Sequence, residues 1–236
     1  MRERQLAIGV NSVSLSYLVR SGFLKWSRYY PLRNISFDIF RGETLGVIGR
    51  NGVGKSSLLR MIAGIVEPDA GEVVNCGVSV SLQALGVGFV PHLTGRENAI
   101  LSGMLMGFSK REMESKMGAI IEFSGIEDFI DQPLRVYSAG MKARIGFATA
   151  IQADPDVLLI DEVLGVGDDE FRVKSLGMMK NIIRSDKTVV LVSHQINIIK
   201  ELCDRVVWIE DGLVRFVGET QEALAQYTVN TSKEFR

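Results

Sequence analysis

Eight residues, "GRNGVGKS" from Gly49 to Ser56, constrain the fold of this 236-residue chain more than any other feature. They fit the pattern G-x-x-x-x-G-K-[ST], in which a glycine-rich turn follows a strand and opens a helix. Gly49, Gly52 and Gly54 let the backbone turn its amides inward around a β-phosphate. Lys55 places a positive charge between the β- and γ-phosphates, and the hydroxyl of Ser56 suits Mg²⁺. The segment therefore predicts a phosphate site within an α/β fold.

A second helix start in the sequence also suits a phosphate. Ser138, Ala139 and Gly140 are small residues, and the stretch after them carries apolar residues at helical spacing. A helix that begins there presents free backbone N–H groups and the positive end of its dipole. The sequence thus predicts two phosphate-binding elements, which raises the question of why one chain carries both.

Polar residues follow two further apolar runs. "VLLIDE" places Asp161 and Glu162 at the end of a strand, where ligands collect in open α/β sheets. We expect Asp161 to hold Mg²⁺ and Glu162 to accept the proton of an attacking water. His194 ends "VVLVSH" in the same way, which favours a contact with a γ-phosphate. His92 sits beside a proline in a loop and is expected to be an ordinary surface residue. Gln83 is either the polar sensor of the phosphate loop or an exposed residue of a strand.

Hydrophobic spacing predicts the rest of the architecture. "SVSLSYL" and "NISFDIF" alternate with a period of two, which is typical of half-exposed antiparallel strands, and an aromatic, basic insert lies between them from Phe23 to Pro31. "TLGVIG", "DVLLID", "TVVLVSH" and "RVVWIE" are short continuous apolar runs, as buried parallel strands have. Asp211-Gly212 predicts a tight hairpin. These patterns indicate an α/β core with an antiparallel β flank.

The segment from about 93 to 153 has a different, helical pattern. Thr94-x-x-Glu97 and Ser109-x-x-Glu112 are capping-box patterns before apolar helical stretches. We therefore expect a helical subdomain inserted in the α/β core.

Composition excludes several classes of protein. A formal net charge of −1 gives no electrostatic reason to expect nucleic acid as a partner. The two cysteines, Cys76 and Cys203, are isolated from each other and fit a reduced compartment. No apolar run reaches the length of a membrane span, and the N-terminus lacks the apolar stretch of a signal peptide. We expect a cytoplasmic chain that meets a membrane only through a partner.

Taken together, these residues resemble the nucleotide-binding subunit of ATP-binding-cassette (ABC) transporters over nearly the whole chain. The order is Walker A (Gly49–Ser56), glutamine loop near Gln83, signature (Ser138 to Met141), Walker B with its glutamate (Val157 to Glu162) and switch histidine (His194). The resemblance implies a single ABC ATPase domain over residues 1–236, with a P-loop NTPase core, ATP and Mg²⁺ as cofactors, and two copies that dimerise head to tail. Each ATP then lies between the Walker A loop of one copy and the signature helix of the other, which explains the two phosphate elements.

The site residues that this resemblance implies form one set. ATP contacts fall on Tyr17, Gly49, Arg50, Asn51, Gly52, Val53, Gly54, Lys55, Ser56, Ser57, Gln83, Ser138, Ala139, Gly140, Met141 and Asp168, catalysis on Glu162, His194 and Lys55, and Mg²⁺ binding on Ser56, Gln83 and Asp161. Asp168 matches the aspartate of the family's D-loop. Trp26, Tyr29 and Tyr30 either replace Tyr17 as the aromatic residue that stacks on adenine or make a membrane-proximal or partner contact.

Departures from the common pattern are similar to one branch of the family. "YSAGM" replaces the common "LSGGQ", and "VLGVGD" stands where many members have Pro-Thr-Ser-Ala-Leu-Asp. Both resemble the branch that exports polysaccharides such as O-antigen, capsule or teichoic acid. The resemblance implies a membrane-spanning permease dimer as partner, a position at the cytoplasmic face of the inner membrane, and a lipid-linked glycan met through the permease. The apolar stretch from Leu85 to Phe108 is the expected permease contact, although most of it also suits the core of the helical insert. We expect no C-terminal sugar-binding module.

Two other functions remain as alternatives. One is transport of another cargo, such as a drug, a lipid or an imported solute. The other is a soluble ABC protein that acts on nucleic acid or ribosomes, which usually carries two cassettes or a long coiled-coil insertion and a basic character.

Overall fold

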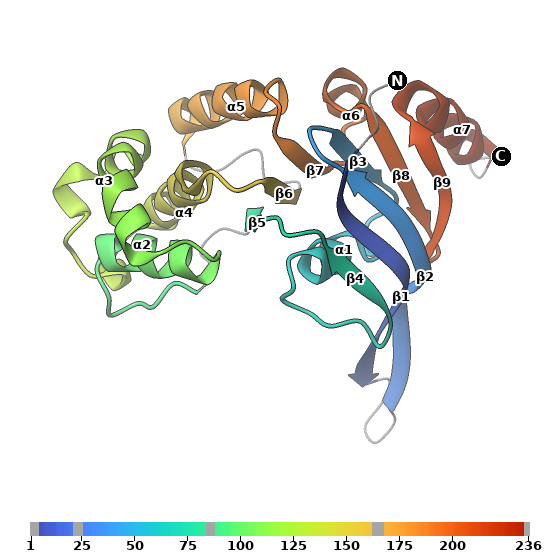
Figure 1. Cartoon of the computed structure of the whole chain (residues 1–236), viewed down its shortest axis with the longest axis horizontal. Helices are drawn as coiled ribbons and strands as arrows, with labels where there is room; N and C mark the ends of the chain where they lie inside the picture. Colours follow the sequence, from blue (N-terminus) through green and yellow to red (C-terminus); the bar gives the residue numbers. More distant parts are fainter. Residues whose placement is uncertain (1–4, 21–25, 84–87, 162–167, 234–236) are drawn as a thin grey trace. The chain divides into compact units, whose positions relative to one another are not determined.

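The computed structural model describes residues 5–20, 26–83, 88–161 and 168–233 (Figure 1). The chain divides into two units, which are described separately below. The first comprises Met1–Val78, Leu159–Glu162 and Ile183–Arg236, and the second comprises Ser79–Leu158 and Val163–Ile182. Within the described ranges, no helix is both long and apolar enough to cross a membrane.

A parallel sheet forms the centre of the first unit. Strand β3 (Thr44–Ile48) lies between β7 (Thr188–Val192) and β8 (Arg205–Glu210), and all three run in the same direction. Every residue of β3 and β7 is buried, which accounts for their continuous apolar runs. Within this unit the strand order is β6-β7-β3-β8-β9, in which β6 (Val157–Asp161) contributes its last residues and β9 spans Leu213–Glu219.

The predicted hairpin closes one edge of this sheet. Strand β9 (Leu213–Glu219) pairs antiparallel with β8, and Glu210 and Leu213 face each other across the turn. Asp211 and Gly212 have φ angles of 51° and 74°, so both are left-handed, as a two-residue type I′ turn requires. Helices α1 (Lys55–Ile62), α6 (Ile196–Leu202) and α7 (Thr220–Lys233) also belong to this unit.

The antiparallel flank is a three-stranded sheet in the order β2-β1-β4. It is formed by β1 (Leu6–Arg20), β2 (Trp26–Phe40) and β4 (Ala70–Asn75). The prediction of an insert from Phe23 to Pro31 is wrong for Trp26 to Pro31. These residues belong to β2, and Arg20 of β1 faces Trp26. The aromatic residues of this stretch favour a strand and continue the pairing.

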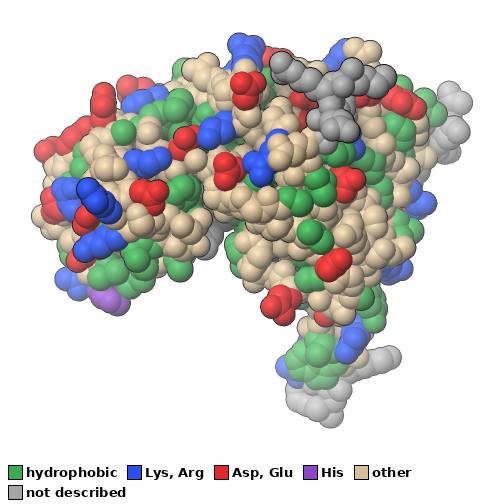
Figure 2. Space-filling model, viewed as in Figure 1, with side chains coloured by type: hydrophobic (Ala, Val, Ile, Leu, Met, Phe, Trp, Pro, Cys, Tyr) green, Lys and Arg blue, Asp and Glu red, His purple; other side chains and the backbone are tan. Residues whose placement is uncertain are grey.

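At the far end of this hairpin, β1 and β2 pair with each other beyond the reach of β4. Strand β4 pairs with β1 no further than Ser14, so among the described strands Tyr17 to Arg20 pair with β2 alone. Leu18 and Trp26 are 66% and 63% exposed, and Figure 2 shows hydrophobic and basic side chains gathered at this tip.

The second unit is mainly helical. Its elements are β5 (Val80–Gln83), α2 (Gly95–Leu105), α3 (Lys110–Ser124), two short 3₁₀ turns (Glu127–Phe129 and Leu134–Val136), α4 (Ala139–Ala153) and α5 (Asp169–Ile183). Helices α2 to α4 fall inside the segment predicted to be helical. Both predicted capping boxes are present at the starts of α2 and α3.

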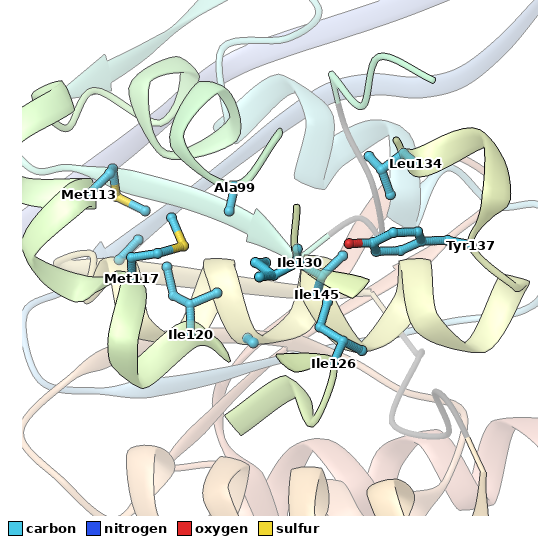
Figure 3. Packing of buried hydrophobic residues seen from close by; sticks show 11 residues of the cluster. Ala99, Met113, Met117, Ile120, Ile126, Ile130, Leu134, Tyr137 and Ile145 are labelled. Atoms are coloured by element: carbon cyan, nitrogen blue, oxygen red, sulfur yellow. The ribbon is translucent and has the colours of Figure 1, made fainter. Parts of the chain in front are cut away.

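Buried apolar side chains from several elements form the core of the helical unit (Figure 3). Met113, Met117 and Ile120 from α3 contribute to the same buried cluster as Ile145 from α4. Tyr137, at the residue before the predicted signature, is also buried there, and its hydroxyl donates a hydrogen bond to the carbonyl oxygen of Phe129. The start of α4 is therefore attached to the core of this unit.

Candidate nucleotide-binding site

The glycine-rich loop connects the end of β3 to the start of α1. At Gly49 the φ angle is 153°, and an added Cβ atom would lie 2.2 Å from the carbonyl oxygen of Ile209. At Gly54 the φ angle is 104°, and an added Cβ would lie 2.8 Å from the carbonyl oxygen of Pro31. Both positions exclude any larger residue on conformation and on space. Gly54 is the N-cap of α1 and provides no side chain to cap it, so the amides at the helix start stay available to an anion.

Lys55 is a buried cation inside this loop. Its side chain is 6% exposed, and its Nζ atom donates hydrogen bonds to the carbonyl oxygens of Gly49 and Arg50, both at 2.9 Å. Burial lowers the pKa of the Lys55 ammonium group, and the negative charge of Asp161 opposes this shift. The loop thus holds positive charge next to the backbone amides that suit a phosphate.

A pocket of about 290 Å³ lies over the loop within the first unit. Its lining is formed by Tyr17, Tyr29, Pro31, Asn51, Gly52, Gly54, Lys55, Ser56, Ser57 and Asp161. The structure therefore brings together eight of the predicted site residues, from β1, the loop, α1 and β6. Tyr29 and Pro31 are additional lining residues.

Ser56 and Asp161 offer oxygen atoms to the same pocket. Mg²⁺ prefers oxygen ligands and usually binds one or two carboxylates together with waters and substrate phosphates. In the described part of the chain no three His, Cys, Asp or Glu residues cluster as a metal site. The donor set thus fits a magnesium ion that is held partly by phosphates.

Two tyrosines of the β1–β2 hairpin contact the loop region. Tyr17 and Tyr29 face each other across the hairpin. The hydroxyl of Tyr17 donates to Oγ of Ser57 at 3.2 Å, and that of Tyr29 donates to the carbonyl oxygen of Gly52 at 2.6 Å. Tyr30 lines a neighbouring pocket of about 350 Å³ together with Arg50 to Val53. Trp26 lines neither pocket. The sequence alone did not favour Tyr29 over the other aromatic residues, because the position of Tyr29 opposite Tyr17 depends on a hairpin that is longer than the predicted one.

The predicted signature forms the start of α4 in the second unit. Ser138 is the N-cap, and its Oγ atom accepts the backbone N–H of Met141 at 3.1 Å. Ser138 and Ala139 are exposed. Gly140 is helical, and the nearest atom to an added Cβ would be Oγ of Ser138 at 3.7 Å. Packing against the described residues therefore does not require a glycine there.

Asp168 lies at the start of α5, in the same unit as the signature. One carboxylate oxygen accepts the backbone N–H of Phe171 at 3.0 Å, and the other pairs with the guanidinium of Arg144 from α4. The hydrogen bond from Phe171, followed by that from Arg144, lowers the pKa of the Asp168 carboxyl. Asp168 thus connects the signature helix to α5. The sequence did not single out Arg144.

Two further predicted residues are described only in part or not at all, and a third is exposed. Glu162 lies outside the described residues. Gln83 ends β5, but its side chain lies outside them. His194 follows β7 and is exposed.

The loop, its buried lysine and the strand-end carboxylate define a nucleotide-binding fold of the P-loop class. The sequence profile described as "ABC transporter" matches residues 32–165, more than half of the chain. The chain therefore belongs to the ABC transporter family, which confirms the predicted ABC ATPase cassette.

Several curated relatives are similar in sequence. The chain is 44% identical to the ABC transporter protein AbcA of Aeromonas salmonicida, over 84% of this chain and 65% of that protein. It is 43% identical to the O-antigen export system ATP-binding protein RfbB of Klebsiella pneumoniae, over 86% of this chain and 83% of that protein. It is 42% identical to the teichoic acids export ATP-binding protein TagH of Listeria innocua, over 86% of this chain and 60% of that protein. The match thus spans less than two thirds of AbcA and TagH.

The solved structures agree on the fold. The ATP-binding cassette MJ0796, in a dimeric structure bound to ADP and Pi, superimposes with a TM-score of 0.72 at 23% identity. That match covers 90% of this chain and 98% of the other. The predicted α/β fold with an antiparallel flank and a helical part is confirmed.

Proposed function

We propose that this chain is the ATP-hydrolysing subunit of an ABC exporter that moves a lipid-linked, O-antigen-like polysaccharide across the cytoplasmic membrane. The observation that carries the ATPase part is the pocket over the loop, which combines Lys55, Ser56 and Asp161. The export part rests on the similarity to RfbB, which is named for O-antigen export.

The roles of the residues follow from their positions. Amides of the 49–54 loop and the ammonium of Lys55 bind the β- and γ-phosphates, and Ser56 and Asp161 hold Mg²⁺, which neutralises phosphate charge when bound. The resemblance to the family supports Gln83 as a further proposed contact to the metal. Glu162 accepts the proton of the attacking water, and His194 contacts the γ-phosphate.

Two copies of the chain complete each site in this proposal. Ser138 and Ala139 are exposed at the start of α4, and Gly140 leaves room that its own chain does not fill. These residues, with Met141, approach the γ-phosphate of ATP bound to the other copy and stabilise the charge that develops there. Asp168 positions the same helix through Arg144.

A membrane-spanning permease dimer is the second proposed partner. Phe89, Met106 and Phe108 of the apolar stretch pack against the helical core, whereas Met104 and Leu105 are 46% and 65% exposed at the end of α2. Flexible methionine side chains suit adaptable contacts, so this pair is the proposed docking position. Docking there places the chain at the cytoplasmic face of the membrane, and the glycan contacts the permease.

Teichoic acid is the alternative cargo, since TagH is similar to this chain at nearly the same identity as RfbB. Capsule, lipid or drug cargo and a non-transport ATPase have no such relative among those reported above.

The experiment that tests the proposal replaces the gene with a Lys55→Ala variant in the source cell. We expect surface polysaccharide to be lost and its lipid-linked precursor to accumulate inside, with Lys110→Ala, an exposed lysine of α3, as a matched control that exports normally. The phosphate content of the precursor separates teichoic acid from an O-antigen-like glycan. Normal surface glycan in the Lys55→Ala strain would contradict the proposal.

A further inference from the structure

The outer edge of the phosphate loop is exposed and is contacted by the β1–β2 hairpin. Gly52 has a φ angle of 80°, no atom of the described residues lies within 4 Å of an added Cβ, and Arg50 to Gly52 are exposed. Lys55 binds the inner part of the loop through Gly49 and Arg50. The hydroxyl of Tyr29 binds the Gly52 carbonyl at 2.6 Å.

The β1–β2 hairpin contacts the loop region at further points, which support the position of the Tyr29 hydroxyl. Tyr29 pairs across the strands with Tyr17, whose hydroxyl contacts Ser57 in the first turn of α1. Two residues further along β2, the carbonyl of Pro31 lies against Gly54. One hairpin therefore touches the loop at its edge, at its end and at the helix that follows.

Peptide geometry connects the Gly52 carbonyl to phosphate binding. A trans peptide is planar, and its C=O and N–H groups point in opposite directions. A bond that fixes the carbonyl of Gly52 therefore also fixes the direction of the Val53 N–H. That N–H is weakly engaged, with its nitrogen 3.4 Å from the Arg50 carbonyl oxygen, which is a long hydrogen bond.

We propose that Tyr29 is a positioning residue for the phosphate loop, whose hydroxyl aims the Val53 amide at the phosphates of the nucleotide. This inference rests on the proposed ATP-binding function. It differs from adenine stacking, in which a tyrosine acts through its ring on the base. An experiment can distinguish the two roles, because the hydroxyl acts on the phosphates and the ring acts on the base.

The test uses Tyr29→Phe, which keeps the ring and removes the hydroxyl. Affinities of the purified full chain for ATP and for inorganic tripolyphosphate are measured with Mg²⁺ present. We expect both ligands to bind more weakly by the same factor, about 2- to 10-fold, the range for one net hydrogen bond. Tyr227→Phe is the matched control, because Tyr227 lies in α7, where its ring packs edge-on against Trp208 with the ring centroids 5.4 Å apart, and it lines neither of the two pockets; we expect no change for either ligand.

Tyr17→Ala provides the contrasting pattern, with weaker ATP binding and a smaller loss for tripolyphosphate, which has no base. Wild-type affinity of Tyr29→Phe for both ligands would overturn the inference, and so would a loss confined to ATP. A wild-type chain that binds neither ligand would instead overturn the proposed ATP-binding function, and this inference with it. Equal thermal stability of Tyr29→Phe and wild type shows that the comparison is between folded proteins.

Discussion

Burial of the Lys55 ammonium is unfavourable, and among the described residues the carbonyl oxygens of Gly49 and Arg50 and the charge of Asp161 compensate for the lost water. An incoming triphosphate supplies the missing negative charge. Lys55→Ala should therefore lose about 10- to 100-fold in ATP affinity, in keeping with the loss of a charged hydrogen-bonding group. Titration calorimetry of this variant beside Lys110→Ala measures the difference. Equal ATP affinities of the two variants would show that the loop does not bind the phosphates through Lys55.

The two cysteines should differ in reactivity. Cys76 is exposed, whereas burial, and then the charge of Asp204, raises the pKa of the Cys203 thiol to about 12. The reactive species is the thiolate, so a thiol reagent at pH 8 should label one cysteine quickly in the native protein and two after unfolding. Rapid labelling of both in the native state would contradict the burial of Cys203.

The same thiol predicts a dependence of stability on alkaline pH. Folded Cys203 keeps its proton up to about 12, while the unfolded chain releases it near 9.0. The folded state therefore binds more protons between these values, and its stability falls as pH rises through this range. Below pH 9 the contribution is complete. Denaturant titrations of wild type and Cys203→Ala should show a shallower decline for the variant above pH 9, and equal slopes would contradict this origin.

At the level of whole helices, α4 carries a glycine that packing against the described part of the chain does not require. Gly140 has room for a methyl group, and so does Gly118 on the exposed face of α3. Alanine in a helix is more stable than glycine by about 0.5–1 kcal/mol. Both Gly140→Ala and Gly118→Ala should therefore raise the unfolding free energy, but only Gly140→Ala should slow ATP hydrolysis. Unchanged turnover in Gly140→Ala would mean that nothing approaches this helix start closely.

Elements set by local chemistry were predictable from the sequence. The Thr94 and Ser109 capping boxes depend on residues three positions apart, and the Asp211-Gly212 turn on two neighbours. The glycine-rich loop was predictable for the same reason, because the backbone conformation that requires glycine lies within the loop itself. These features need no knowledge of distant segments.

Contacts between distant segments were not predictable in the same way. The Tyr29 hydroxyl meets Gly52 because β1 and β2 continue pairing beyond the alternating stretches. Arg144 meets Asp168 because α4 and α5 pack in one unit. No pattern in either stretch specifies its partner, since the partner is chosen by register and packing.

The whole molecule carries its two phosphate-suited elements in different units, the loop in one and the α4 start in the other. If each ATP is held by the loop of one copy and the helix start of another, two different inactive variants should complement each other. Lys55→Ala disables a loop and keeps its signature, whereas Gly140→Asp places an anion at the signature and keeps its loop. Each variant alone should hydrolyse almost no ATP.

In an equal mixture, half of the dimers are heterodimers, and each contains one intact site out of two. Hydrolysis should therefore recover to about a quarter of the wild-type rate, because one loop and one signature without substitutions meet in each heterodimer. Steady-state phosphate release from the mixed full-length chains measures this recovery, with each variant at the same total concentration as the baseline. Gly140→Asp alone should still bind ATP with near wild-type affinity. A mixture that stays as inactive as its components would show that loop and helix act within one copy, and that the trans site does not exist.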